Sequence, residues 1–243
     1  MATLYHFPRS LSSAAVQVVT ELEAPVRVAV LGFEHGQFVP PGDTPVRLPL
    51  GGMGLIGPVR SCPTYVEEEA SLTLVQCAAI VERLCDRFDP DNTLRPTDSA
   101  ARARHLSLLV FAEATFFPVV QFLSPEGAAH DNAREAMRRA RFCGLIAPFL
   151  LDQLGTQLYL CGDRVSACDF LVGMPCLNNA FNAGVLAEFP ALREYFARLR
   201  ERESFKIAHG DPNDASLGNA LGAMVRTAHT DSWDFSHRAP HER

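Results

Sequence analysis

Hydrophobic and polar positions in the first part of the chain follow two different periods. Residues 4–7 read as a short strand, and the apolar positions that follow recur with helical spacing from Ala15 to Leu22. Pro25 ends this helix, and residues 26–33 are β-branched and apolar enough for a central strand. A strand, a helix and a second strand in this order predict a right-handed crossover and a parallel strand pair.

A hairpin and a second helix follow after an irregular stretch. Residues 34–57 are rich in glycine and proline, and no regular element is readable there. Residues 64–66 and 71–74 are short apolar runs on either side of an acidic turn, which predicts a hairpin. The next helix has an apolar face from Ile80 to Phe88. The first unit is therefore βαβ followed by ββα.

The rest of the chain has helical periodicity alone. Residues 89–96 are polar and contain two prolines, as is typical of a linker. Helices are predicted after it over residues 98–123, 131–154, 167–183 and 190–203. We therefore expect an α/β domain at 1–88, an all-helical domain at 97–225 and a polar tail at 226–243.

Ser166 begins one of these helices, and Asp169 follows it three residues later. This is the pattern of a capping box, in which the Ser166 hydroxyl accepts from the Asp169 amide and the carboxylate accepts from the Ser166 N–H. The apolar face of the helix runs from Phe170 to Phe181. A helix this apolar is buried, so we expect the box to serve the fold rather than the chemistry.

Composition narrows the choice of partners. The chain has 243 residues, of which 47% are hydrophobic and 21% charged, as in ordinary globular proteins. The net charge of −6 and the isoelectric point near 5.7 give no basic footprint for nucleic acid or an anionic membrane. No apolar run reaches the roughly 18 to 20 residues that span a bilayer, and the first residues lack a signal-peptide pattern. We expect a cytoplasmic protein without nucleic-acid or membrane partners.

The seven cysteines are scattered, form no C-x-x-C pair and have no histidines at zinc-finger spacing. Neither a disulfide framework nor a metal site is expected from this pattern. Most of the cysteines are expected to be small core residues.

The segment from Tyr159 to Phe170, Y-L-C-G-D-R-V-S-A-C-D-F, joins a turn to the capping box. This compound pattern resembles the second domain of the cytosolic glutathione transferases, and the βαβ-ββα order is similar to their first domain. The resemblance covers residues 3 to about 208. It implies a thioredoxin-like N-terminal domain, an all-helical C-terminal domain, glutathione as cosubstrate and a homodimer.

Two further motifs carry the expected glutathione contacts. Residues 57–63 are similar to the family's N-P-x-G-x-V-P and keep both prolines at the same separation. The resemblance implies a cis bond before Pro63 and backbone pairing between Cys62 and the cysteinyl unit of glutathione. It also implies that Gln76 and the Cys77 amide bind the γ-glutamyl end, where a helix start suits a carboxylate. Cysteine replaces the family's serine at position 77, so a strong hydroxyl donor becomes a weak thiol donor.

The loop after the first strand contains the candidate catalytic residue. In the serine-type classes a hydroxyl here donates to the glutathione sulfur, and the stretch from Arg9 to Ser13 is similar to the zeta-class pattern R-S-S-C-S. The resemblance implies Ser10 as the catalytic residue, with Ser12 as the alternative. Serines before a helix also commonly act as caps, so a loop without a catalytic serine is the third interpretation. Leu11 stands where the beta class has its cysteine.

Taken together, the motifs resemble a divergent, serine-type (zeta- or theta-like) glutathione transferase. The resemblance implies an enzyme that conjugates glutathione to small hydrophobic electrophiles or reduces them. The electrophile site is expected between the domains, lined by the first loop and by the helix face with Phe111, Phe116 and Phe117. A place for these aromatics in the helix core is the equally open alternative. Two alternatives stay open: a non-catalytic interaction module, as in the elongation factor gamma subunit, and a glutathione-dependent isomerase of the zeta type. Three departures from the family favour the module: Arg60 in place of glycine, Cys77 in place of serine and the irregular stretch over residues 34–57.

Overall fold

The computed structural model describes residues 1–34, 37–39, 62–124 and 132–210. Its N-terminal part contains a four-stranded sheet in the order β2-β1-β5-β6. The strands are β1 (Ala2–His6), β2 (Val26–Val30), β5 (Thr64–Glu67) and β6 (Leu72–Val75). β1 pairs parallel with β2 and antiparallel with β5, and β6 is the antiparallel partner of β5. The predicted parallel pair and the predicted hairpin are both confirmed.

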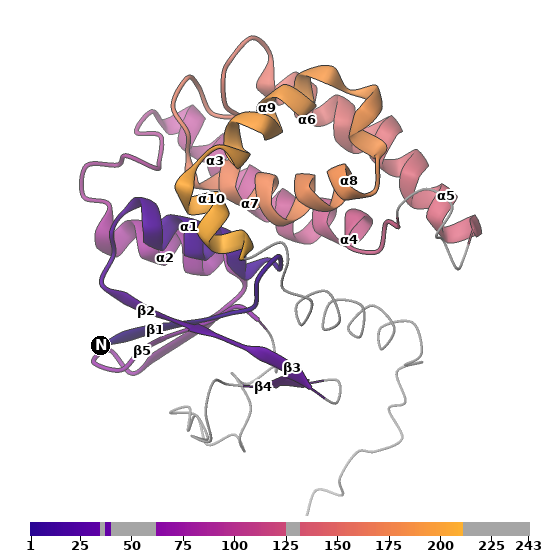
Figure 1. The fold of residues 1–243 in the computed structure, drawn as a ribbon. Helices are drawn as coiled ribbons and strands as arrows, with labels where there is room; N and C mark the ends of the chain where they lie inside the picture. Colours follow the sequence, from indigo (N-terminus) through magenta and orange to yellow (C-terminus); the bar gives the residue numbers. More distant parts are fainter. Residues whose placement is uncertain (35–36, 40–61, 125–131, 211–243) are drawn as a thin grey trace, which may run out of the picture.

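Helices α1 (Ser12–Glu21) and α2 (Cys77–Phe88) lie between this sheet and the helical part of the molecule (Figure 1). Their inward positions are fully buried: Ala15, Val18, Ile80 and Leu84. Burial of each large apolar side chain stabilises the fold by about 1.5 to 3 kcal/mol. The periodicity of the sequence is thus a consequence of packing, and the N-terminal part has the thioredoxin-like order βαβ-ββα.

The C-terminal part is all helical in the residues that the structure describes. Its α-helices are α3 (Ser99–Phe111), α4 (Phe117–Val120), α5 (Asn132–Arg141), α6 (Ala147–Leu154), α7 (Ala167–Leu171), α8 (Asn178–Asn182), α9 (Pro190–Arg200) and α10 (Glu203–His209). Two π-helical turns, η1 (Ala112–Phe116) and η2 (Phe142–Ile146), join α3 to α4 and α5 to α6. This arrangement confirms the predicted fold class.

Helix α1 is the element that both parts share, because α7 and α10 pack against it. Arg202 donates to both carboxylate oxygens of Glu21 at the end of α1, at 2.8 and 2.6 Å. The Ser13 hydroxyl at the other end of α1 donates to the carbonyl of Ala208 at 3.2 Å. These contacts hold the loop before α1 in a fixed position between the sheet and the helical part.

The capping box at the start of α7 is confirmed. The carboxylate of Asp169 is fully buried and accepts the Ser166 N–H and hydroxyl, each at 2.8 Å. It also accepts the Leu160 N–H at 3.0 Å and the Tyr195 hydroxyl at 2.7 Å. One side chain therefore satisfies four buried donors from three parts of the chain.

The predicted helix over residues 167–183 is interrupted. Met174 has φ −127° and ψ 121°, outside the helical region, and the cis-bonded Pro175 follows it within η3 (Val172–Leu177). Proline has no N–H for the helical ladder, and its ring clashes with the preceding turn. Phe170 is fully buried, whereas Phe181, beyond the break, is 41% exposed. The prediction of one continuous buried face was wrong for Phe181.

The predicted strand over residues 26–33 is too long. β2 ends at Val30, and the chain then forms β3 (Gly32–Glu34), which pairs with β4 (Gln37–Val39) in a separate two-stranded sheet. Gly32 marks the break, since a residue without a side chain weakens a strand interior. The β3–β4 hairpin therefore begins within the predicted strand and extends into residues 34–57, where no regular element was predicted.

Some predictions fall outside the described residues. These are the rest of the irregular stretch, the motif positions before Ser61 and the polar tail, within residues 40–61 and 211–243. The domain limits 1–88, 89–96 and 97–225 stay predictions.

The segment Ser99–Val120, which comprises α3, η1 and α4, is long and apolar enough to cross a membrane by length and composition alone. No such run was recognised in the sequence. In the structure 39% of its most apolar window is buried inside the protein. The buried positions include Leu108, Leu109, Ala112 and Phe116. Packing into the helical core accounts for the apolar character of these positions.

Candidate functional site

The loop between β1 and α1 carries the predicted catalytic serines. It turns at Arg9, whose φ of 63° lies in the left-handed region that residues with a side chain rarely adopt. The Ser10 hydroxyl donates to the carbonyl of Phe7 at 2.7 Å and lies 2.7 Å from the Ser12 hydroxyl. It also accepts the N–H of Ser12, the first residue of α1, at 3.2 Å. Ser10 therefore accepts a hydrogen bond from the first amide of α1, and its side chain is half-buried.

Ser12 is enclosed by protein groups. It is fully buried, accepts the Phe7 N–H at 3.0 Å and donates to the Phe7 carbonyl at 3.1 Å. Its oxygen also lies 2.8 Å from Nδ1 of His6. Burial lowers the pKa of His6 to about 4, so its imidazole is neutral at pH 7. Of the two serines, Ser10 is the one with an accessible side.

The Cys62–Pro63 peptide bond is cis, as the resemblance implied, and it directly precedes β5. The Cys62 sulfur lies 4.0 Å from the Ser10 hydroxyl and donates to the Tyr5 carbonyl at 3.7 Å. Burial raises the pKa of the Cys62 thiol to about 11, even though hydrogen bonds from Ser12 and Ser10 act to lower it. The Cys62 thiol is therefore protonated at neutral pH, and the thiol form is not the nucleophile.

Helix α2 begins directly after Gln76, whose φ of 73° is also left-handed. The Cys77 side chain is fully buried, and its thiol donates to the carbonyl of Leu11 at 3.0 Å. Burial raises the pKa of Cys77 well above its usual range. The Cys77 thiol thus connects the start of α2 to the loop that carries Ser10.

The first amides of α2 already bind a carboxylate. The Cys77 N–H donates to Oε1 of Glu113 at 2.8 Å, and the Ala78 N–H donates to Oε2 at 2.9 Å. A helix start favours anions because its amides are unpaired and its dipole end is positive. Glu113 comes from η1 and occupies the position at which the resemblance places the γ-glutamyl carboxylate of glutathione. No local pattern in the sequence predicts this contact, because Glu113 lies 36 residues from Cys77.

An apolar cavity of about 620 Å³ lies beside this helix start. Gln76 and Glu82 line it from the side of α2, and Leu106, Val110 and Glu113 line it from the side of α3 and η1. This cavity places exposed apolar surface next to the carboxylate of Glu113.

The phenylalanines that were expected to line an electrophile site belong to the helical core. Phe116 is fully buried, and Phe111 lies against Phe149 with ring centroids 4.6 Å apart. Phe117 packs against the same core. Of the two interpretations, the helix core is the correct one for Phe116, which has no exposed surface.

Three segments that are distant in sequence therefore meet at one site. The first loop contacts Cys62 through Ser10 and contacts the start of α2 through Leu11. The site offers a hydroxyl, a backbone edge before a cis-proline and a helix start that binds a carboxylate.

No protein-family model and no curated protein matches the sequence. Solved structures of glutathione transferases match the fold with a probability of 1.00. The enzyme from Methylococcus capsulatus is 19% identical, with a TM-score of 0.65 over 92% of this chain and 100% of that one. A sphingomonad enzyme complexed with glutathione is 20% identical, with a TM-score of 0.65 over 91% and 98%.

The theta-class enzyme from Xanthomonas axonopodis pv. citri, with glutathione bound, is 24% identical. Its TM-score is 0.61 over 86% of this chain and 97% of that chain. At these identities the likeness concerns the fold. The chain has the fold of the glutathione transferases, with a thioredoxin-like domain followed by an all-helical domain.

Proposed function

We propose that this protein is a serine-type glutathione transferase-like enzyme that activates the glutathione thiol for reaction with small hydrophobic electrophiles. The proposal is carried by one observation: the loop with Ser10 contacts both Cys62, which precedes the cis-bonded Pro63, and the start of α2. These are the three segments to which the resemblance assigned the sulfur, the cysteinyl backbone and the γ-glutamyl end of glutathione. Two proteins of the same fold carry bound glutathione.

Ser10 is the residue that we assign to the glutathione sulfur. Its hydroxyl is half-buried and has one protein acceptor, the Phe7 carbonyl, whereas Ser12 is fully buried between Phe7 and His6. Donation to a thiolate requires the Ser10 proton to rotate from the Phe7 carbonyl toward the sulfur. The contact with Ser12, 2.7 Å away, then holds the Ser10 oxygen in position.

The energies are sufficient for this role. Lowering a thiol pKa from about 8.5 by two units needs roughly 2.7 kcal/mol of preference for the thiolate. One hydrogen bond to a charged acceptor contributes about 1.5 to 3 kcal/mol. The start of α1, directly after this loop, adds about 0.3 to 1 kcal/mol through the helix dipole.

The thiolate then attacks the substrate. With a carbon electrophile, a C–S bond forms and the leaving group departs with its bonding electron pair. With a disulfide, the thiolate attacks one sulfur and the other leaves as a thiolate. The proton of the glutathione thiol passes to solvent in both reactions.

The γ-glutamyl carboxylate of glutathione competes with the Glu113 side chain for one binding site. Both carboxylates fit the same two amides, Cys77 N–H and Ala78 N–H. Glutathione binding therefore includes the displacement of Glu113, which lowers the net affinity.

This competition also favours the second candidate, a non-catalytic interaction module. A protein whose anion site is filled by its own side chain keeps the fold without binding the cosubstrate. The isomerase alternative rests on the Arg9-Ser10 pair. The homodimer, the cytoplasmic location and the lack of nucleic-acid or membrane partners are carried forward as predictions.

Calorimetry and a conjugation assay with an aromatic halide test the proposal on the full chain. Glutathione is expected to bind with micromolar to millimolar affinity, about −8 to −4 kcal/mol. Ser10→Ala is expected to reduce turnover at neutral pH about ten- to a hundredfold, or about 1.4 to 2.7 kcal/mol, with little change in glutathione affinity.

Ser13→Ala is the matched control, since Ser13 is a buried serine of the same segment that faces Ala208. Equal activity of Ser10→Ala and Ser13→Ala contradicts the serine mechanism. Binding without activity toward any electrophile or disulfide supports the module over the transferase. No heat with glutathione also supports the module and rejects both glutathione-dependent functions.

A further inference from the structure

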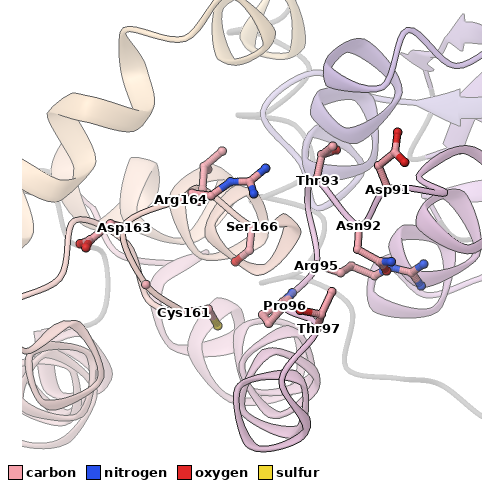
Figure 2. Close-up of a pocket in the computed structure, with 12 residues that line it drawn as sticks. Asp91, Asn92, Thr93, Arg95, Pro96, Thr97, Cys161, Asp163, Arg164 and Ser166 are labelled. Atoms are coloured by element: carbon pink, nitrogen blue, oxygen red, sulfur yellow. The ribbon is translucent and has the colours of Figure 1, made fainter.

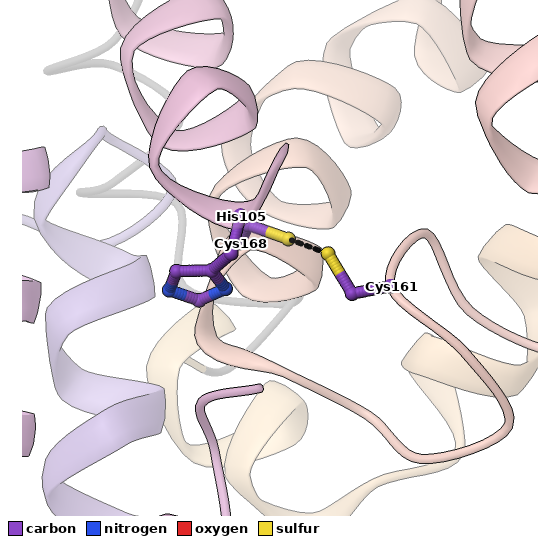
Figure 3. Close-up of side chains that lie close together, drawn as sticks. All are labelled: His105, Cys161 and Cys168. Carbon is purple, nitrogen blue, oxygen red and sulfur yellow. Dashed lines mark hydrogen bonds between the residues drawn. The ribbon is translucent and has the colours of Figure 1, made fainter. Parts of the chain in front are cut away.

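A second cluster of reactive side chains lies away from the glutathione site, in the helical part. It consists of His105 on α3, Cys161 in the loop before α7 and Cys168 on α7 (Figure 3). One potential ligand atom from each residue lies within 4.8 Å of the others. The residues are separated by 56 and 7 positions in the sequence, so no ligand spacing reveals the cluster.

His105 is fully buried and has one free nitrogen. Its Nε2 lies 3.1 Å from Oε1 of Glu82 on α2, while Nδ1 has no hydrogen-bond partner among the described residues. Arg102 also donates to Glu82, so the carboxylate is charged and accepts the Nε2 proton. The tautomer assigned in this way leaves the lone pair of Nδ1 without a donor. A buried polar atom without a partner is costly, and such an atom points to a ligand.

The two sulfur atoms have the separation of thiolates on a tetrahedral metal ion. They lie 3.7 Å apart, and both cysteines are free. A zinc–sulfur bond of about 2.3 Å at a tetrahedral angle places two sulfurs about 3.8 Å apart. A disulfide requires about 2.05 Å.

The surroundings also match those of metal ligands. A histidine that binds a metal usually donates its other N–H to a carboxylate, as His105 does to Glu82. The Ser166 hydroxyl, whose proton goes to Asp169, lies 3.2 Å from the Cys168 sulfur. Two thiolates and a neutral imidazole balance the charge of a divalent ion, and this soft donor set selects zinc.

A cavity of about 280 Å³ adjoins the cluster at Cys161, the one of the three residues that lines it. It lies between the linker and the loop before α7, and Thr93, Arg95, Cys161 and Ser166 are among its lining residues (Figure 2). Three protein ligands with the fourth position open to a cavity is an arrangement that zinc adopts in proteins.

We propose that His105, Cys161 and Cys168 form a metal site of the zinc class, with Glu82 as the carboxylate that orients His105. Most of the cysteines were expected to be small core residues, and a metal was not expected. The fold brings them together because the loop before α7 returns to α3, where the capping box fixes it.

Metal uptake by the full chain tests this proposal. The protein is stripped with a chelator under reducing conditions, titrated with Zn²⁺ or with Co²⁺ as a spectroscopic probe, and dialysed. About one equivalent of metal is expected to remain bound, and Co²⁺ is expected to show thiolate charge transfer and tetrahedral absorption. Glu82→Gln is expected to weaken the affinity for the metal about ten- to a hundredfold, while the thiolate charge-transfer band remains.

Cys161→Ala and Cys168→Ala are each expected to abolish the tight site. Cys176→Ala is the matched control, a fully buried cysteine of η3 whose thiol donates to the Ala112 carbonyl. The half-buried Cys161 keeps the test valid if Cys168→Ala does not fold. Three results overturn the proposal: no uptake by the reduced protein, uptake that survives both cysteine variants, or uptake lost equally in Cys176→Ala.

Discussion

The starts of α7 and α2 are both closed by a carboxylate, but the two carboxylates come from different places. Asp169 lies in the first turn of its own helix α7, is fully buried and accepts four hydrogen bonds. Glu113 reaches α2 from another helix, is half-buried and accepts the Cys77 and Ala78 amides. The same chemical group therefore serves a permanent cap in one case and a removable one in the other.

The difference separates a structural helix start from a binding site. Asp169 cannot leave without exposing buried donors, among them the Leu160 N–H and the Tyr195 hydroxyl. Glu113 borders a cavity into which its side chain can move, and the two amides of α2 then become available to another anion. We therefore expect mutations at the first carboxylate to affect stability and mutations at the second to affect ligand affinity.

The largest expected effect is that of Asp169→Ala. Removal of the carboxylate leaves buried donors of Leu160, Ser166 and Tyr195 without an acceptor, at a total cost of about 3 to 5 kcal/mol in the free energy of unfolding. Urea unfolding measures this loss. Asp163→Ala is the control, since Asp163 lies in the loop before α7 and is exposed. It accepts one hydrogen bond, from the Leu158 N–H at 3.3 Å. Equal losses in the two variants contradict the assignment.

Local patterns in the sequence predicted the structural elements that depend on residues close together in the chain. Spacing within a few positions predicted the capping box of α7, the hairpin and the helix with its apolar face from Ile80 to Phe88. It also predicted a helix over residues 190–203, which the structure forms as α9 up to Arg200. The break at Met174 was missed because Pro175 interrupts an apolar spacing that continues on both sides. Element type therefore follows from periodicity, whereas breaks depend on single residues.

Long-range contacts were not readable from the sequence. The resemblance located Gln76 and Cys77 at the start of α2, but the carboxylate of Glu113 reaches them across 36 residues. The cluster of His105, Cys161 and Cys168 has the same property, because its members come together when α3 and α7 pack. Such sites are set by tertiary packing, which a spacing rule does not contain.

Glu113→Ala is expected to have a smaller effect, which lowers the melting temperature but raises the affinity for glutathione. Loss of the hydrogen bonds between Glu113 and the Cys77 and Ala78 amides is expected to lower the melting temperature slightly. Glutathione affinity is expected to rise about tenfold, or about 1.4 kcal/mol, because its carboxylate no longer displaces a competitor. Calorimetry and thermal unfolding measure the two changes on the same samples.

Glu188→Ala is the control for Glu113→Ala, since Glu188 is an exposed carboxylate on a different element, η4 (Val185–Glu188). A fall in glutathione affinity in Glu113→Ala assigns Glu113 to the ammonium group of the ligand and rejects the competition. Unchanged affinity separates the glutathione site from the start of α2.

The smallest expected effect concerns the middle of α2, which is anchored independently of Glu113. Arg83 on α2 donates to both carboxylate oxygens of the buried Glu67 on β5, at 2.8 Å each, and Arg87 approaches the same carboxylate at 2.9 Å. The hydrogen bonds from Arg83 lower the pKa of Glu67 to about 2, from an ordinary value of 4.5. The Arg83 side chain is 37% exposed, so solvent screens the pair and its contribution is about 1 kcal/mol or less.

The pH dependence follows from the direction of this shift. Between pH 4.5 and about 2 the unfolded chain binds a proton at Glu67 that the folded chain does not, so the contribution of the pair is complete above pH 4.5 and is lost as the pH falls to about 2. Arg83→Gln is expected to remove most of this acid-dependent loss in urea unfolding, and Arg87→Gln, a weaker contributor to the same shift, is expected to remove less. An acid profile that is identical in both variants assigns the loss of stability to other carboxylates.

Glutathione affinity is expected to be unchanged in Arg83→Gln, because the anion site lies at the start of α2 and the Arg83–Glu67 pair at its middle. A weakened affinity shows that glutathione binding depends on the Arg83–Glu67 pair as well as on the start of α2.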